Sequence, residues 1–100
     1  MRITEQEKQA MITIGKHYFG EEAKVYLFGS RADLHKKGGD IDLYVETNLS
    51  AKDSIKAKIS FLVDLKLAIG EQKIDVVVKA LDAVSQPIYD IAKKTGILLC

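Results

Sequence analysis

The sequence predicts a small α+β fold, a mixed sheet of three to four strands with helices packed on one face. Three apolar runs of strand length, at residues 24–28, 40–46 and 73–79, alternate with longer segments whose apolar residues recur at helical spacing. Because so few strands cannot form a large sheet covered on both faces, the helices are expected on one face. One hundred residues with 47% hydrophobic content suffice for a single small core, so we expect one domain, residues 1–100.

The first helix is expected from about residue 5 to residue 18. Thr4 and Glu7 have the Ser/Thr-x-x-Glu spacing of a capping box, in which the two side chains satisfy free backbone N–H groups. Apolar residues follow at helical spacing, and the helix is expected to end near Gly20. Residues 24–28 then form a strand that is rich in aromatic and β-branched side chains.

The middle of the chain adds a turn, a second strand and a second helix. Ser30 begins a helical turn expected over residues 30–35, and the next strand spans residues 40–46. Ser50 can cap a helix that continues up to Gly70. A wide apolar stripe follows this helix, formed by Ile55, Ile59, Leu62, Val63 and Leu67. The lysines of the helix fall mainly off the stripe and are expected on a solvated face; they are Lys52, Lys56, Lys58 and Lys66.

The third strand, residues 73–79, carries one carboxylate in an apolar run. Alternation places Asp75 on one face and three aliphatic side chains on the other, those of Ile74, Val76 and Val78. A carboxylate in such a strand is costly unless it is paired, hydrogen-bonded or bound to a metal, so Asp75 needs an explanation. A last helix follows with Pro87 in its first turn and ends at Gly96. The apolar tail after Gly96 can either dock on another chain or close the core of this one.

Candidate functional residues cluster around the first two strands. A strand that ends in Gly29-Ser30 lets backbone approach an anionic ligand closely, because glycine has no side chain to hold the ligand away. Asp40 and Asp42 lie two residues apart at the start of the next strand, so both carboxylates leave the same face. A phosphate cradle facing paired carboxylates is the arrangement that Mg²⁺-dependent phosphoryl or nucleotidyl transfer requires.

Each of these patterns also has a purely structural interpretation. An Asp-x-Asp pair at the start of a strand is more often the polar side of an amphipathic strand, and Gly-Ser after a strand is more often a turn. The combination of both patterns with a third strand aspartate, Asp75, is much harder to reach by accident. A site built from Gly29, Ser30 and the three aspartates would face the open side of the sheet.

Composition excludes several other classes. Fifteen basic residues against fourteen acidic ones give a net charge of +1, which argues against a long nucleic-acid track. Cys100 is the only cysteine, so no internal disulfide forms and a cytoplasmic setting is expected. No signal peptide or membrane-spanning run is apparent. The sequence has no Walker-type phosphate loop and no Gly-x-Gly-x-x-Gly, which disfavours kinase-like and dinucleotide-binding functions.

Three segments resemble one family, the minimal nucleotidyltransferases of the DNA polymerase β-like superfamily. They are Gly29-Ser30-Arg31-Ala32, Asp40-Ile41-Asp42-Leu43 and Ile74-Asp75-Val76-Val77. The resemblance implies that Gly29 and Ser30 hold the phosphates of ATP and that Arg31 neutralises charge on the triphosphate. It further implies that Asp40, Asp42 and Asp75 bind two Mg²⁺ ions and are the catalytic residues.

The resemblance also implies a partner. Small proteins of this type are similar to antitoxins that pair with a HEPN-domain ribonuclease toxin in a hetero-oligomer and block it by moving AMP from ATP onto a toxin tyrosine. Two alternatives remain open from the residues alone. The domain can be a non-catalytic or nucleotide-dependent binding subunit that inhibits its partner by covering it. It can also be a scaffold in which the three aspartates are only solvated.

Overall fold

The computed structural model describes residues 2–32 and 40–100. Its elements, in chain order, are α1 (Glu5–Phe19), β1 (Lys24–Phe28), the short 3-10 helix η1 (Gly29–Ala32), β2 (Ile41–Glu46), α2 (Ala51–Ile69), β3 (Ile74–Lys79), α3 (Pro87–Thr95) and β4 (Ile97–Leu98). The predicted helices and strands are all present, with bounds that differ by no more than two residues. The turn expected over residues 30–35 is seen only in its first part, because residues 33–35 lie outside the described residues.

The predicted helix caps are confirmed. At the start of α1 the Glu7 backbone N–H donates to Thr4 Oγ1 (3.0 Å) and the Thr4 N–H donates to Glu7 Oε1 (2.8 Å), which completes the capping box. At the start of α2 the Asp53 N–H donates to Ser50 Oγ (3.2 Å). Pro87 is the first residue of α3, where its missing N–H costs nothing.

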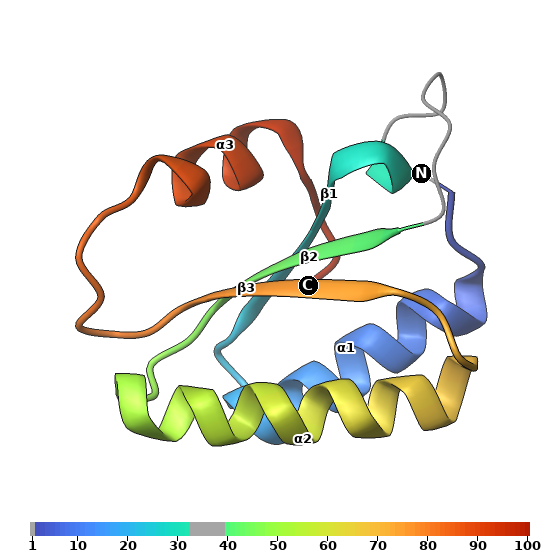
Figure 1. The fold of residues 1–100 in the computed structure, drawn as a ribbon, viewed down its shortest axis with the longest axis horizontal. Coiled ribbons are helices and arrows are strands. Elements are labelled where there is room, and N and C mark those ends of the chain that lie inside the picture. Colours follow the sequence, from blue (N-terminus) through green and yellow to red (C-terminus); the bar gives the residue numbers. More distant parts are fainter. Residues whose placement is uncertain (1, 33–39) are drawn as a thin grey trace.

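The four strands form one mixed sheet in the order β3-β2-β1-β4 (Figure 1). β1 is antiparallel to both of its neighbours, β2 and β4, whereas β2 and β3 are parallel. The parallel pair requires a crossover connection, which α2 provides. The α+β class and the mixed sheet of up to four strands are therefore confirmed.

Helices lie on both faces of this sheet rather than on one. α1 and α2 cover one face as expected, whereas α3 lies against the opposite face (Figure 1). Tyr89 and Ala92 of α3 pack there on Tyr26 and Tyr44 of the two central strands. These strands carry large aromatic side chains on that face, and covering them removes apolar area from water. α3 contacts β1, β2 and η1 but not β3 among the closely packed pairs of elements, so the β3 side of this face stays open.

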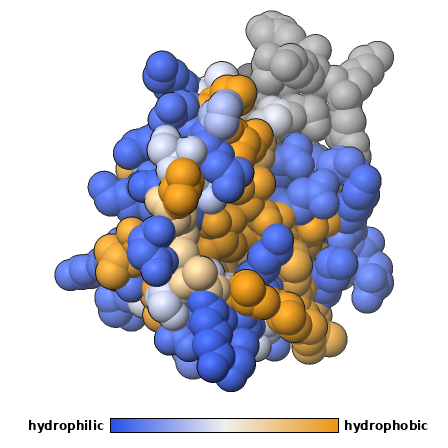
Figure 2. All heavy atoms as spheres, turned by 60° about the vertical axis from the view of Figure 1, so that its left-hand side comes forward, coloured by the Kyte–Doolittle hydropathy of each residue, from blue (hydrophilic) through white to orange (hydrophobic). Residues whose placement is uncertain are grey.

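The apolar stripe expected on α2 does not form its buried face. The residues of α2 that are buried against the sheet and α1 are Ser54, Ala57, Phe61 and Leu65. Four members of the expected stripe are each more than half exposed, namely Ile55 (62%), Ile59 (61%), Val63 (54%) and Leu67 (80%). Apolar side chains also reach the surface between hydrophilic ones where α2 and α3 begin (Figure 2).

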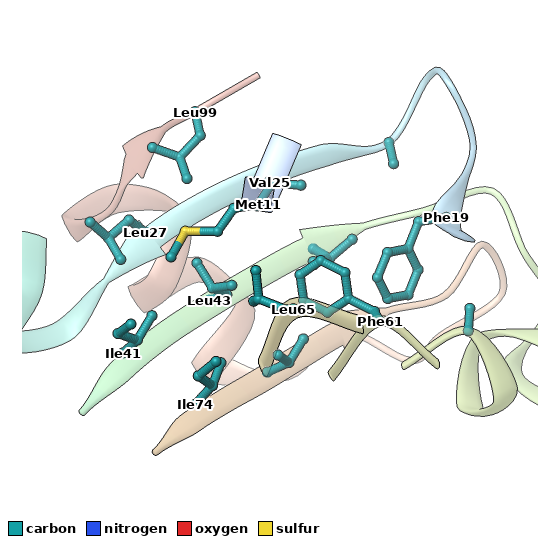
Figure 3. Close-up of a cluster of buried hydrophobic side chains, with 14 residues drawn as sticks. Met11, Phe19, Val25, Leu27, Ile41, Leu43, Phe61, Leu65, Ile74 and Leu99 are labelled. Atoms are coloured by element: carbon teal, nitrogen blue, oxygen red, sulfur yellow. The ribbon is translucent and has the colours of Figure 1, made fainter. Parts of the chain in front are cut away.

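The main core fills the space between the sheet and the pair α1 and α2 (Figure 3). Every second residue of the central strands points into it, as Leu27 and Leu43 do, and both are fully buried. Phe61 and Leu65 of α2 meet them from the helix side, with Met11 from α1. This face is closed to ligands, so a site on the sheet must lie on the other face.

The apolar tail joins the sheet of its own chain. Ile97 and Leu98 pair with β1, and the Leu99 N–H donates to the Val25 carbonyl at 2.8 Å. Leu99 is buried in the main core. Of the two alternatives for the tail, the structure therefore supports closure of the chain's own core. Within the described residues, none of the helices has the length and apolar character needed to cross a bilayer.

Candidate active site

Three strand ends meet at one edge of the sheet. Because β1 is antiparallel to β2 and β2 is parallel to β3, the end of β1 lies beside the beginnings of β2 and β3. In this register Asp42 is paired with Phe28 on one side and with Asp75 on the other. Asp40 directly precedes β2 and, two residues before Asp42, belongs to the same face. The fold thus brings together the three aspartates singled out from the sequence; we call them the carboxylate group.

Gly29 lies directly against this group. Its φ of +73° is in the left-handed region that side chains rarely adopt. A β carbon built at Gly29 would overlap Asp42 Oδ2 and lie 3.1 Å from Asp42 Cγ. The backbone at the start of η1 therefore approaches the carboxylate more closely than any other residue type allows. The sequence predicted a close backbone approach to a phosphate at Gly29; the structure shows a close approach to the Asp42 carboxylate, and the phosphate-binding role stays a prediction.

Ser30 and Arg31 follow Gly29 in the backbone of η1. Their backbone therefore lies at the same edge of the sheet as the carboxylate group. Their side chains lie outside the part of the molecule that the structure describes, so the roles predicted for them stay predictions.

The charges of the carboxylate group repel one another. The pKa of Asp42 is raised above its usual value, first by partial burial and then by the nearby charges of Asp75 and Asp40, while Lys73 lowers it. Lys73 Nζ lies 3.5 Å from Asp40 Oδ2, but both side chains are largely solvated, so this pair contributes little. The site thus has excess negative charge that a cation would offset.

Asp75 is exposed rather than buried, which corrects the energetic argument made from the sequence. β3 is an edge strand of the sheet, and water reaches the first part of the strand where Asp75 lies. No burial cost therefore has to be offset at this position. What distinguishes Asp75 is its place beside Asp42 in the parallel register.

The donor chemistry of the carboxylate group fits a magnesium ion, although the group is not closed around one point. Mg²⁺ takes oxygen ligands, usually one or two carboxylates together with phosphates of the substrate and water. Within residues 2–32 and 40–100, no three Asp, Glu, His or Cys side chains converge closely enough to hold a metal ion. Three repelling carboxylates on neighbouring strands still match what a hard divalent cation with phosphate ligands needs.

Two groups of polar side chains on this face of the sheet were missed in the sequence. Lys73 lies beside Asp40, and its position two residues before Asp75 was a usable signal for the same face. The other is an aromatic and charged group at the opposite end of the same face. There Tyr44 donates to Glu46 Oε2 (2.9 Å), and Lys93 Nζ lies 3.5 Å from that oxygen. Tyr44 stacks on Tyr89, with 5.8 Å between ring centroids.

The two hollows of the described surface also lie toward this second end. A pocket of about 330 Å³ is lined by residues that include Glu46 and Lys79, at the ends of β2 and β3, and Lys93 of α3. A smaller one of about 190 Å³ lies between Tyr44, Tyr89 and the connection that precedes α3. Neither of these two pockets includes the carboxylate group, which lies where β2 and β3 begin.

The order and geometry of these elements agree with the comparison of the sequence with known proteins. A search of curated proteins finds no significant match. Residues 9–99, nearly the whole chain, match the family described as "Nucleotidyltransferase domain". This match supports the resemblance to the DNA polymerase β-like superfamily and assigns the general activity, nucleotidyl transfer. The chain therefore belongs to the nucleotidyltransferase domain family.

Proposed function

We propose that this protein is a Mg²⁺-dependent transferase that moves AMP from ATP to a hydroxyl side chain, a tyrosine, of a HEPN-domain ribonuclease, and that it acts as the antitoxin of that partner. The observation that carries the proposal is the contact between Gly29 and Asp42, with Asp75 in register beside them. Backbone that approaches a carboxylate so closely brings a phosphate-binding turn and a cation-binding group to one point.

The residues have separate roles in binding. Gly29 and Ser30 present backbone to the phosphates, and Arg31 offsets triphosphate charge. Asp40 and Asp42 would hold the two Mg²⁺ ions, and Asp75 would complete the metal site on the acceptor side. When bound, Mg²⁺ supplies electrostatic stabilisation to the attacking and leaving oxygens.

The transfer itself is an in-line substitution at the α-phosphorus of ATP. The acceptor hydroxyl oxygen forms a bond to this phosphorus, the bond to the bridging oxygen of the β-phosphate breaks, and pyrophosphate leaves with that electron pair. The hydroxyl proton passes to a carboxylate, and we assign this role to Asp75, which is exposed and therefore accessible to an acceptor. Asp75 is exposed on the edge strand β3, a position that suits an acceptor as large as a protein.

A labelling experiment tests the proposal. The wild type, Asp42→Asn and Glu46→Gln are each incubated with the protein encoded beside this chain, which the proposal expects to be a HEPN ribonuclease, together with Mg²⁺ and ATP labelled at the α-phosphate. We expect the partner to gain the mass of AMP with the wild type and with Glu46→Gln but not with Asp42→Asn. If all three proteins inhibit the ribonuclease equally and leave its mass unchanged, the protein is a covering subunit and the catalytic proposal fails.

A further inference from the structure

We propose that the outer face of α2 is a docking surface for an acidic, amphipathic helix of a partner protein. This inference goes beyond the proposed transfer, because α2 covers the face of the sheet opposite to the carboxylate group. The surface consists of an outer stripe of four aliphatic residues, Ile55, Ile59, Val63 and Leu67. It also contains three lysines that project between them, Lys52, Lys56 and Lys66.

The outer stripe is continuous along the helix. Its members recur every fourth residue, so at about 1.5 Å of rise per residue they form one ridge about 18 Å long. Each is more than half exposed. Single apolar residues at a surface are common and need no explanation, whereas a ridge of this length leaves a contiguous area that a monomer rarely exposes.

Packing inside the chain does not use this ridge. α2 meets α1 on another side, where Tyr18 donates to Asp64, and it meets the sheet through Phe61 and Leu65. At about 100° per residue, Phe61 and Leu65 project roughly opposite to Ile59 and Val63. The ridge therefore points away from the sheet and from α1, which pack most closely on α2 within the described residues.

The charge of this face identifies the partner. The expectation that the lysines of α2 lie mainly off the apolar stripe is wrong for three of the four: at 100° per residue, Lys52, Lys56 and Lys66 fall within the arc of the outer stripe. No Asp or Glu falls within that arc. None of the three lysines makes an ion pair with another side chain of the described residues. A partner with its own apolar ridge and flanking carboxylates would bury the stripe and pair the lysines.

A second copy of this chain fits the face poorly. An antiparallel pairing that sets Ile55 against Leu67 and Ile59 against Val63 also sets Lys56 against Lys66 of the second copy. A parallel pairing sets each lysine against itself. Both arrangements bring like charges together without a carboxylate on the face to separate them.

An anionic membrane fits less well than an acidic helix. Interfacial helices keep their lysines on a polar side and often insert aromatic residues, so that the apolar side enters the lipid alone. Here the three lysines fall within the arc of the aliphatic residues instead of on a separate polar side, and the face has no aromatic side chain. A ridge of residues four apart instead matches the groove between ridges of another helix.

Binding of two synthetic peptides tests the surface. One probe is a helical peptide with leucine at every fourth position and glutamate on both sides of this ridge, and the other has lysine in place of each glutamate. By fluorescence anisotropy, the wild type should bind the glutamate peptide at least about tenfold more tightly than the lysine peptide. Ile59→Ser combined with Val63→Ser should weaken this binding about tenfold or more. Lys52→Glu, Lys56→Glu and Lys66→Glu together should reverse the preference.

Matched controls separate this surface from general stickiness and from the transfer site. Leu81→Ser combined with Val84→Ser changes two aliphatic residues that are equally exposed but lie between β3 and α3, and it should leave peptide binding unchanged. Circular dichroism checks that each variant is folded. The Asp42→Asn variant should bind the glutamate peptide as the wild type does, so failure of the catalytic proposal leaves this result intact.

Four outcomes of the peptide and sedimentation experiments would overturn the proposal. They are equal binding of both peptides, no binding of either, an equal loss of binding in the Leu81 and Val84 variant, and a dimer in sedimentation that the Ile59 and Val63 variant abolishes. Binding to vesicles of phosphatidylglycerol, lost in the triple lysine variant while the glutamate peptide fails to bind, would also overturn it and assign the face to lipid.

Discussion

Two acidic residues of β2, Asp42 and Glu46, lie on the same face of the same strand and in very different surroundings. Glu46 accepts a hydrogen bond from the hydroxyl of the buried Tyr44, and its Oε2 lies 3.5 Å from Lys93 Nζ. The charge of Glu46 is therefore compensated within the chain. Asp42 has two carboxylates as neighbours and a raised pKa. One end of the strand is therefore built for stability, and the other is built to meet a positive charge from outside.

The same contrast extends to the backbone. At the Glu46 end, α3 and its aromatic contacts cover the sheet. At the Asp42 end, a glycine with no room for a side chain replaces such a cover. Within the described residues, the carboxylate at the Glu46 end has its partners in the chain, whereas at the Asp42 end three carboxylates have only the solvated Lys73 to offset them.

The largest effect is expected at Gly29. Gly29→Val forces a side chain onto the Asp42 carboxylate, and we expect AMP transfer to fall by about a hundredfold or more, because small displacements at a reacting centre are enough for that. The matched control is Gly70→Val, since Gly70 also has a positive φ (+94°) but open space around it. Both variants should lose about 1–3 kcal/mol of stability through backbone strain. Equal transfer rates in the two variants would show that phosphate does not bind at Gly29.

The next effect concerns stability at the other end of the strand. Glu46→Ala removes the acceptor of the buried Tyr44 hydroxyl, and we expect the free energy of unfolding to fall by about 1–3 kcal/mol. Glu22→Ala removes an exposed hydrogen bond to Asn48 and should cost less than about 0.5 kcal/mol. Urea unfolding measures both. A loss in Glu22→Ala as large as that in Glu46→Ala would contradict the structural role of Glu46.

A smaller effect of opposite sign is expected at Asp42. Without divalent metal at neutral pH, Asp42→Asn removes a partly buried charge that its neighbours repel, so the free energy of unfolding should rise. Asp53→Asn, in the first turn of α2, removes a charge that the helix dipole favours and should lower it slightly. Added Mg²⁺ and ATP should raise the melting temperature of the wild type more than that of Asp42→Asn. A loss of stability in metal-free Asp42→Asn would mean that this carboxylate is already compensated.

The smallest effect is a pH dependence at Tyr44. Burial, followed by its hydrogen bond to Glu46, raises the pKa of Tyr44 above the ordinary value of 10.0. The unfolded chain therefore releases this proton before the folded one, so the stability linked to Tyr44 is present below pH 10.0 and is lost as the pH rises above it. Urea unfolding between neutral and alkaline pH should show a smaller loss for Tyr44→Phe than for the wild type. Identical slopes would place the Tyr44 hydroxyl in water.

The sequence predicted those features that depend on neighbouring residues. Capping at Thr4 and Ser50, the strand ends at Gly29 and Asp40, and the alternation around Asp75 follow from local periodicity and turn chemistry, and the structure has them all. These features also position the carboxylate group, because its aspartates lie where β2 and β3 begin.

Features that depend on tertiary packing were less predictable. In sequence, the aliphatic stripe of α2 has the spacing of a buried helix face. In the structure, however, Phe61 and Leu65 pack against the sheet and α1 instead. The placement of α3 could have been anticipated from Tyr26, Phe28 and Tyr44, which make the second face of the sheet too aromatic to stay uncovered. The exposure of Asp75 follows from the position of β3 at the sheet edge, which strand order alone decides.

Calorimetric titration with ATP, in the presence and absence of Mg²⁺, tests most directly whether the Asp42 end of β2 is the functional end. The wild type and Glu46→Gln should bind ATP with Mg²⁺ equally well and much more weakly without it, while Asp42→Asn should lose the benefit of Mg²⁺. Equal affinity of the wild type and Asp42→Asn for ATP in the presence of Mg²⁺ would contradict the assignment of the carboxylate group as the site of nucleotidyl transfer.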